Sequence, residues 1–249
     1  LITHDFTRRM ALNHRRVVPA GRDGRLDSSF GELGRFALTL AQYEPLQVKH
    51  TNDTAIHLIT LGLLTGRRTK EMKSMEWNWV NFDKRLITIP GEVAVQDGDV
   101  STFEGTKNRR DFIIPMSRII HTMFRHRAEQ KLSARFVFPG RDRTGPITDM
   151  RSTLAHLIQQ SKVKRIIPHD LRRTFGDISR RCRPDEYTTA ESLGHTVNTV
   201  TAMYLSGLSL PEKRSLFQDI SDHVSRSMPV EGLEVGGEKY SFSGQEDLE

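Results

Sequence analysis

The spacing of apolar residues changes twice along this chain, and this pattern leaves few fold classes open. Ile56, Ile59, Leu63 and Leu64 follow the three-and-four spacing of a helix with a buried face, which ends near Gly66. In the centre of the chain the spacing is that of short β-strands, and helical spacing then returns. We therefore predict an α+β fold that is mainly α-helical and carries a small antiparallel β-sheet.

Two short runs of β-forming residues, 86–90 and 112–115, supply the expected strands. A polar, glycine-containing stretch separates them, so they are expected to pair as antiparallel neighbours. After the second run, Met150 and Leu154 begin a new helical stripe, for which Thr148 is the expected N-cap.

The compact part of the chain is expected to be one domain over residues 30–227. Residues 1–29 combine six arginines with proline and glycine, which predicts an exposed basic linker or the remnant of an upstream domain. A capping box at Ser209 and Glu212 opens the last helix of the domain. Residues 228–249 are acidic and rich in glycine, and this composition predicts a flexible tail.

The formal net charge is +6, and residues 228–249 hold six acidic groups and one lysine. The remaining residues therefore carry +11, which favours an anionic partner, although a solvated basic surface has the same composition. The single Cys182 excludes an internal disulfide, and no cysteine and histidine cluster has zinc-ligand spacing. The longest apolar runs are much shorter than a membrane span requires. We therefore expect a reducing, cytoplasmic location without membrane contact.

A histidine and an arginine with helical spacing form the first chemical motif. Pro168, just before His169, favours a helix start at this point. His169 and Arg172 are three residues apart, so an imidazole and a guanidinium would share one helix face and could approach the same oxyanion. A basic surface helix is the alternative for this segment taken by itself.

A second arginine motif is the sequence TGRRTKE at residues 65–71. The carboxylate of Glu71 can hold the guanidinium of Arg68 in one orientation, with its planar fork directed at a phosphate. An arginine and a glutamate at this spacing are also common on exposed helices, and that alternative stays open.

A third motif places a tyrosine after a histidine. Leu193, Gly194 and His195 are followed, nine residues after the histidine, by Tyr204. This region offers a further phosphate ligand and a nucleophile. A tyrosine on a helix, taken alone, is more often an ordinary core or surface aromatic.

The ordered motifs TGxRxxE, HxxR and LGH with the later tyrosine lie within residues 65–204, and together they resemble the tyrosine recombinases of the phage integrase family. The resemblance depends on the order in which these motifs occur, because each short motif by itself is common in proteins. The resemblance implies that residues 30–227 are the catalytic domain. It implies these catalytic residues: Arg68, His169, Arg172, His195 and Tyr204, with Glu71 as the supporting acidic residue.

The family also places a catalytic lysine on a β-hairpin between its two arginine motifs. Lys107, shortly before the second expected strand, is the best match, and Arg109 and Arg110 are the alternatives. The polar stretch before it is longer than the usual hairpin of the family. Arg67 stands where the family often has an apolar residue, and it is expected to face solvent.

The resemblance implies a site-specific recombinase or integrase that cleaves and rejoins double-stranded DNA through a 3′-phosphotyrosyl bond, for prophage or mobile-element integration. It implies no metal, nucleotide or other cofactor. It also suggests a homotetramer on paired DNA sites, accessory DNA-bending or directionality proteins, and association with the nucleoid of a bacterial or phage-infected cell. The segment with Leu208, Leu210 and Leu216 is expected either to dock between neighbouring protomers or to pack on its own domain.

Three other readings of the sequence remain. A DNA-binding regulator on the same fold would not use the cleavage residues. A type IB topoisomerase-like enzyme would use a tyrosine and two arginines to relax supercoils. A helical protein with a basic surface would carry the motifs by coincidence.

Overall fold

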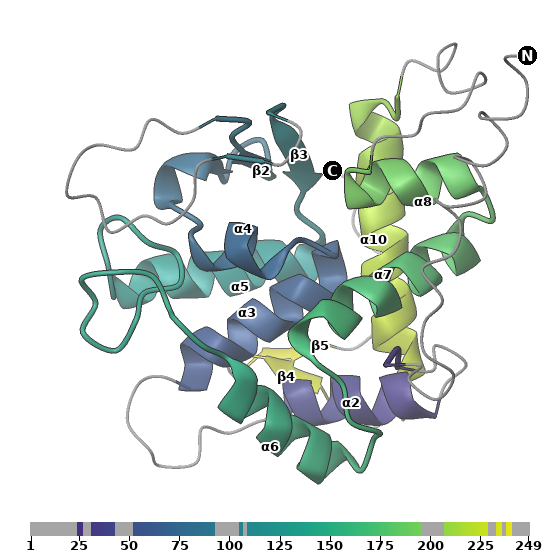
Figure 1. Cartoon of the computed structure of the whole chain (residues 1–249), viewed down its shortest axis with the longest axis horizontal. Coiled ribbons are helices and arrows are strands. Elements are labelled where there is room, and N and C mark those ends of the chain that lie inside the picture. The colour runs from purple at the N-terminus through teal and green to yellow at the C-terminus, as the bar shows by residue number, and fades with distance from the viewer. Residues whose placement is uncertain are drawn as a thin grey trace, which may run out of the picture.

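The computed structural model describes residues 24–26, 31–42, 52–92, 105–106, 109–195, 207–228, 233–235 and 238–240. Most of this part is helical, and a small three-stranded antiparallel sheet lies at its upper edge in Figure 1. The expected mainly α-helical α+β fold is thereby confirmed. Among the described helices, none is both long enough and apolar enough to cross a bilayer.

Helix α3 (Asn52–Thr65) is the centre of the core. Its leucines and isoleucines are buried on every side, and Leu58, Ile59 and Leu61 have no exposed surface. The helix is therefore enclosed all round, whereas the spacing of its apolar residues predicted only one buried face. The helices that surround it are α5 (Arg118–Gln130), α6 (Arg151–Ser161), α7 (Pro168–Cys182) and α10 (Leu210–Ser227).

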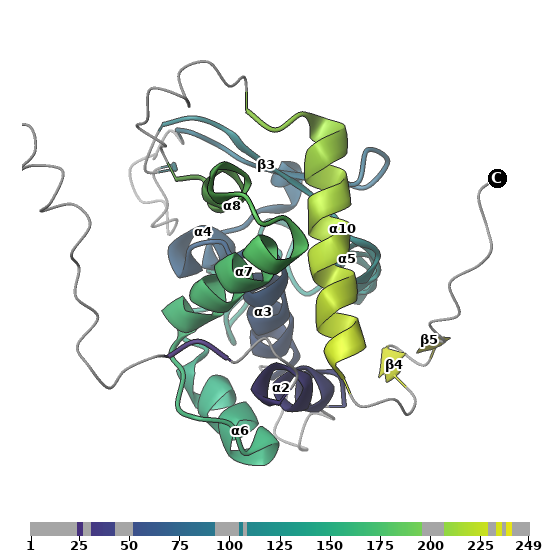
Figure 2. The same ribbon diagram turned by 90° about the vertical axis from the view of Figure 1, so that its right-hand side faces the viewer.

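Two helices extend this core on opposite sides. Helix α2 (Glu32–Ala41) packs against α6 and α10, and it buries Leu33 and Phe36 completely. Helix α8 (Glu186–Leu193) packs against α7 (Figure 2).

The sheet consists of β1 (Val80–Asn81), β2 (Leu86–Ile89) and β3 (Phe112–Pro115), in that order. The two strands expected from the sequence pair antiparallel, with Ile87 opposite Ile114, and both side chains are fully buried. Strand β1 was not expected, because two residues are too few to show a β period. It follows directly on the short 3-10 helix η1 (Trp77–Trp79).

Helix α6 begins later than the sequence predicts. Its N-cap is Met150, so the expectation that Thr148 caps the helix is wrong. The Thr148 carbonyl accepts a hydrogen bond from the Lys73 ammonium, and the Asp149 carboxylate accepts one from the backbone N–H of Arg151. The hydrogen bond from Lys73 holds Thr148 outside the helix. The Asp149 carboxylate, in place of the Thr148 hydroxyl, satisfies the backbone N–H of Arg151 in the first turn.

Helix α10 packs on the domain that carries it. Ser209 caps it together with Glu212, as expected, and it packs against α7 and, at its lower end in Figure 2, against α2. Leu216 is buried in the core and Leu208 packs against it, whereas Leu210 remains exposed. Of the two alternatives for this segment, packing on its own domain describes α10, and this counts against docking of the helix between protomers.

Three short described stretches near the two ends of the chain, residues 24–26, 233–235 and 238–240, make contacts that the composition did not indicate. Leu26 is fully buried and its N–H donates to the Thr174 hydroxyl at 3.1 Å, so the expectation of an exposed linker does not hold for residues 24–26. In the tail, β4 (Leu233–Val235) pairs antiparallel with β5 (Glu238–Tyr240). The expectation of a flexible tail overlooked this hairpin, which the two glycines between the strands signal in the sequence.

Candidate active site

The first arginine motif is a sharp connection between two helices. Helix α3 ends at Gly66, whose φ of +60° lies in the left-handed region, and a Cβ at this position would lie 2.4 Å from the Phe175 ring. Arg68 then caps α4 (Thr69–Lys73). The buried Glu71 carboxylate accepts from the Arg68 guanidinium at 2.8 Å and from its backbone N–H at 3.2 Å. The expected pair is therefore present, and it holds Arg68 with 33% of its side chain exposed.

Helix α7 carries the second motif, as expected. Pro168 is in its first turn, and the buried Asp170 carboxylate accepts from the Ile167 N–H at 2.9 Å. His169 lies at the surface, while Arg172, on the same side of the helix, is almost fully buried. Burial, Arg173 and Arg172 lower the pKa of His169 below its usual value, so its ring is neutral near pH 7.

Arg172 joins the three motifs. Its guanidinium donates to the Gly66 carbonyl at 2.6 Å, to the Leu193 carbonyl at 2.8 Å and to Nε2 of His195 at 2.8 Å. Burial and the neighbouring Arg68 lower the pKa of Arg172 to about 10, although Glu71 opposes them, so the group stays charged near neutrality. One buried cation thus fixes the geometry of three segments that are far apart in the sequence.

His195 follows Gly194, which ends α8 with a φ of +67°. Because a guanidinium can only donate hydrogen bonds, Nε2 of His195 must be the acceptor, and the proton of the neutral ring is on Nδ1. Burial of part of the ring, Arg172 and Arg68 lower the pKa of His195 to about 4. The ring therefore offers one N–H donor at physiological pH.

The stability of the chain should fall in mild acid. Burial and Arg127 lower the pKa of His57 to about 3, and Arg127 donates to its Nδ1 at 3.0 Å. Because the folded value lies below the unfolded value of roughly 6.5, the unfolded state binds the extra proton as the pH drops. We expect His57 to cost about 2 kcal/mol of unfolding free energy between pH 7 and pH 5, measured by urea titration. In His57→Gln, the unfolding free energy should fall less between pH 7 and pH 5. An unchanged dependence on pH would show that His57 does not cause the loss.

The structure brings Arg68, His169, Arg172 and His195 together with the carboxylate of Glu71. Two guanidinium groups and an imidazole N–H suit the nonbridging oxygens of a phosphate, because charge-assisted donors bind such oxygens strongly. The Glu71 carboxylate orients Arg68. The arrangement can therefore bind and polarise a phosphodiester.

Two expected site residues, Lys107 and Tyr204, lie outside the described residues. Of the residues around Lys107, Thr106 and Arg109 are described. The Thr106 N–H donates to the Pro90 carbonyl at 3.1 Å, which returns the chain to the end of β2. The Arg109 N–H donates to the Thr106 carbonyl at 3.0 Å, and Arg109 lies three residues before β3.

Arg67 does not face solvent, and the expectation for it is wrong. Only 3% of the residue is exposed. Its guanidinium donates to the Ser192 carbonyl at 3.0 Å and lies 3.7 Å from the centroid of the Phe112 ring. These partners replace water around the cation, but the sequence gives no local signal for them, because they come from distant segments.

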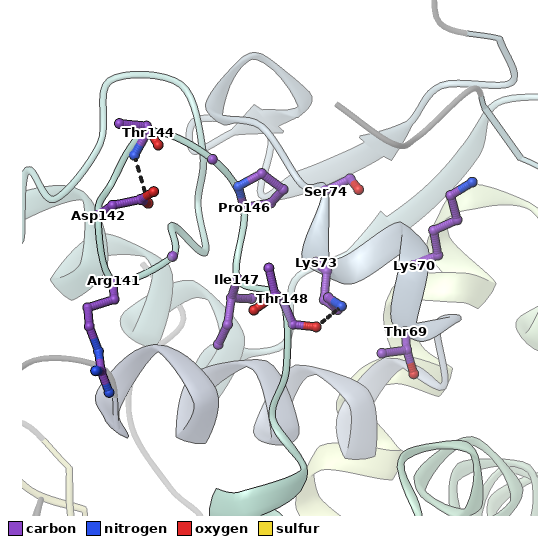
Figure 3. A pocket seen from close by; sticks show the side chains of 12 residues that line it. Thr69, Lys70, Lys73, Ser74, Arg141, Asp142, Thr144, Pro146, Ile147 and Thr148 are labelled. Carbon is purple, nitrogen blue, oxygen red and sulfur yellow. Dashed lines mark hydrogen bonds between the residues drawn. The ribbon is translucent and has the colours of Figure 1, made fainter. Parts of the chain in front are cut away.

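A basic cleft of about 760 Å³ lies beside the first arginine motif, between α4 and the loop at residues 140–148 (Figure 3). Lys70 and Lys73 of α4 line one wall, and Arg141 lines the other. Thr69, which also lines the cleft, directly follows Arg68 in the chain. The cleft therefore borders the segment that carries Arg68, and its charged lining residues are Lys70, Lys73, Arg141 and Asp142.

Comparison with known proteins gives the same family as the sequence motifs. The model of the phage integrase family matches residues 38–208. The prophage integrase IntZ of Escherichia coli (strain K12) is 27% identical over 205 residues, which cover 81% of this chain and 45% of that protein. The integrase of Shigella phage Sf6 is 34% identical over 87 residues, which cover 34% of this chain and 20% of that protein. The chain thus spans less than half the length of either relative.

Solved structures show a similar fold. The XerH site-specific recombinase bound to its difH substrate, in a pre-cleavage complex, superposes with a TM-score of 0.52 at 17% identity, over 70% of this chain and 48% of that one. This likeness concerns the fold alone. Together, the family match across most of the described domain, the ordered motifs and their convergence at Arg172 lead to one conclusion: the chain belongs to the phage integrase family.

Proposed function

We propose that this chain is the catalytic part of a site-specific DNA recombinase, which integrates a prophage or another mobile element through a phosphotyrosyl bond at Tyr204. The observation that best supports the proposal is the set of bonds from Arg172 to Gly66, Leu193 and His195. These bonds join the three segments that carry the proposed phosphate-binding groups. The names of the two integrases and the DNA-bound recombinase add support.

In the cleavage step, the Tyr204 oxygen attacks the phosphorus and the bond from phosphorus to the 5′-oxygen breaks. The phenol has a pKa of roughly 10, so its proton must be removed, and the neutral ring of His169 accepts it. The 5′-oxygen takes the electron pair of the broken bond and a proton from the Lys107 ammonium. The products are a 3′-phosphotyrosyl bond and a free 5′-hydroxyl.

Negative charge grows on the nonbridging oxygens during attack. Arg68, Arg172 and the Nδ1–H of His195 are the donors that stabilise it, and Glu71 keeps Arg68 in position. Because their positions are set before the substrate arrives, little reorganisation is needed in the transition state. Rejoining reverses the step with a 5′-hydroxyl from a partner strand, and it needs no nucleotide, because one phosphodiester replaces another.

Cleavage should persist in an excess of chelator. The proposed help to the phosphate comes from arginine and histidine side chains, so removal of divalent cations is expected to change the rate of adduct formation by less than about threefold. The measurement compares adduct yield with EDTA and with added magnesium. Complete inhibition by the chelator, on DNA that the protein still binds, would point to a different mechanism.

The partner and assembly that fit this activity are double-stranded DNA and a homotetramer on paired sites, with accessory DNA-bending or directionality proteins. Residues 30–227 then form the catalytic domain, residues 1–29 the connector to an upstream domain or its remnant, and residues 228–249 an acidic tail. The place of action is the nucleoid of a bacterial or phage-infected cell.

The experiment that tests the proposal uses a nicked duplex with the candidate attachment site, labelled so that a trapped covalent adduct is visible on a denaturing gel. Peptide mapping of the adduct should identify Tyr204. Binding without any adduct would favour a DNA-binding regulator on the same fold. Relaxation of supercoiled DNA that lacks an attachment site would favour the topoisomerase-like alternative.

A further inference from the structure

Three cationic side chains line the cleft between α4 and the loop at residues 140–148, and the proposed mechanism uses none of them. Lys70 and Lys73 come from α4, and Arg141 comes from the loop (Figure 3). Thr69, the residue after Arg68, lines the same cleft. The cleft therefore lies next to the proposed phosphate site, and its cations need an explanation of their own.

The walls of the cleft are held together by bonds within the chain. The Lys73 ammonium donates to the Thr148 carbonyl, which joins α4 to the end of the loop. The loop is closed on itself, because the Gly140 N–H donates to the Gly145 carbonyl at 2.8 Å. A ligand in this cleft would thus meet groups that are already in place, which lowers the cost of binding.

The cleft presents cations that have no anionic partner in the described part of the chain. Lys70 and Arg141 are exposed, and among the described residues neither side chain donates to a carboxylate or to a carbonyl. Arg173 and Arg180 differ in this respect, because each pairs with an aspartate at 2.9 Å. An ammonium has three N–H donors, and the described bond of Lys73 uses one of them. These donors are therefore available to an anion from outside the chain.

Asp142 is the one carboxylate among the described lining residues. It is engaged within the loop, where it accepts from the Thr144 N–H at 3.2 Å. The lining thus combines three cations with one carboxylate, and this balance favours an anionic ligand.

The uncharged polar side chains of the lining indicate the kind of anion. All of them are hydroxyls, and they belong to Thr69, Ser74, Thr144 and Thr148. Lysine, arginine, serine and threonine are side chains that contact the phosphates and sugars of DNA. Asparagine and glutamine, which read the edges of adenine, are absent from the described lining. The lining therefore favours the sugar-phosphate backbone over the bases.

Neighbouring phosphates of one DNA strand are spaced closely enough to lie beside α4. The helix rises by roughly 6 Å from Thr69 to Lys73. One strand of B-DNA carries a phosphate for roughly every 3.4 Å of its axis. A strand whose cleaved phosphate lies at Arg68 can therefore place about one or two further phosphates beside this helix.

We propose that this cleft binds the phosphate backbone of the cleaved DNA strand, at phosphates next to the one that reacts. Lys70 and Arg141 contact these phosphates, and Lys73 joins the two walls. Because such contacts do not read bases, the cleft adds affinity for any DNA sequence. The inference rests on the proposed function, because it takes the cleaved phosphate to lie at Arg68 and Arg172.

Gel-shift titrations at several salt concentrations test these contacts, with Lys70→Gln and Arg141→Gln beside the wild-type chain. Each lost contact should reduce the slope of log affinity against log salt by about 0.9, and should weaken binding about fivefold at roughly 0.15 M salt. The loss should be the same on the attachment-site duplex and on an unrelated duplex of equal length. Both side chains are exposed, so the substitutions should leave the fold intact.

Ethylation interference identifies the phosphate that each side chain contacts. The wild-type chain should lose affinity when phosphates beside the cleaved link are ethylated, because an ethyl ester removes their charge. In Lys70→Gln, ethylation of one of these phosphates should no longer weaken binding, and in Arg141→Gln a different phosphate should become insensitive. A wild-type interference pattern in both variants would overturn the proposed location.

Arg180→Gln is the matched control, because it removes one exposed positive charge near the other end of α7. Its salt slope and its interference pattern should stay those of the wild-type chain. An equal reduction of the slope in Arg180→Gln would mean that the total charge of the chain matters and the cleft does not. Unchanged slopes in Lys70→Gln and Arg141→Gln would also overturn the proposal.

Two further outcomes would contradict the role of the cleft. Tighter DNA binding in Lys70→Gln and Arg141→Gln would mean that the cleft holds an acidic segment of the protein itself. Slower adduct formation at saturating DNA, with wild-type affinity, would assign these cations to the reaction instead of to binding. A wild-type chain that binds DNA without forming an adduct would reject the proposed function, whereas the salt slopes and interference patterns would still decide whether the cleft binds phosphates.

Discussion

Tyr204→Phe is expected to bind attachment-site DNA like the wild-type chain and to form no covalent adduct. Phenylalanine keeps the aromatic ring but lacks the oxygen that attacks the phosphorus, so no phosphotyrosyl bond can form. The expected loss is therefore complete, below the detection limit of a denaturing gel, with an unchanged gel-shift affinity. The result would identify the nucleophile. Tyr204 lies outside the described residues, so its assignment comes from the sequence motif.

Tyr187→Phe is the matched control for this prediction. Tyr187 lies in the first turn of α8, the helix that ends before His195, and it is outside the proposed mechanism. This variant should form adduct at the wild-type yield. If the Tyr204→Phe protein still formed adduct at normal yield, another residue would be the nucleophile and the assignment of Tyr204 would be withdrawn.

Arg172→Lys is expected to reduce the rate of adduct formation by about a hundredfold or more. A lysine keeps the positive charge but cannot donate at once to the Gly66 carbonyl, the Leu193 carbonyl and the His195 ring. Loss of one donor to the phosphate alone raises the barrier by roughly 3 kcal/mol, and here the positions of the neighbouring donors change as well. Single-turnover kinetics at saturating DNA isolate this step from binding.

Arg173→Lys offers the control on the next residue of α7. Arg173 is exposed and pairs with Asp170 at 2.9 Å, and a lysine can keep that ion pair. Its rate should stay within about twofold of the wild-type rate, because a lysine keeps the charge at this position and its pairing with Asp170. Equal slowing in the two variants would mean that the loss is not specific to the guanidinium of Arg172.

Local patterns were sufficient for most of the fold. The spacing of apolar residues and the helix-capping residues predicted the strands at residues 86–90 and 112–115 and the helix that starts at Pro168. These signals depend only on residues that are neighbours in the chain. The errors lie where a distant partner intervenes. Thr148 is drawn out of α6 by the Lys73 ammonium, and Leu26 is buried against α7 although it lies in a segment with the composition of a linker.

The sequence by itself determined which groups form the candidate site, because the resemblance of its ordered motifs to the family points to Arg68, Glu71, His169, Arg172 and His195. It also determined the Arg68 and Glu71 pair, whose partners are neighbours on one helical turn. Only the tertiary structure decided that Arg172 bonds the Gly66 and Leu193 carbonyls and that Arg67 lies buried on Phe112. Such contacts join segments far apart in the chain, and a local period carries no information about which distant surfaces meet.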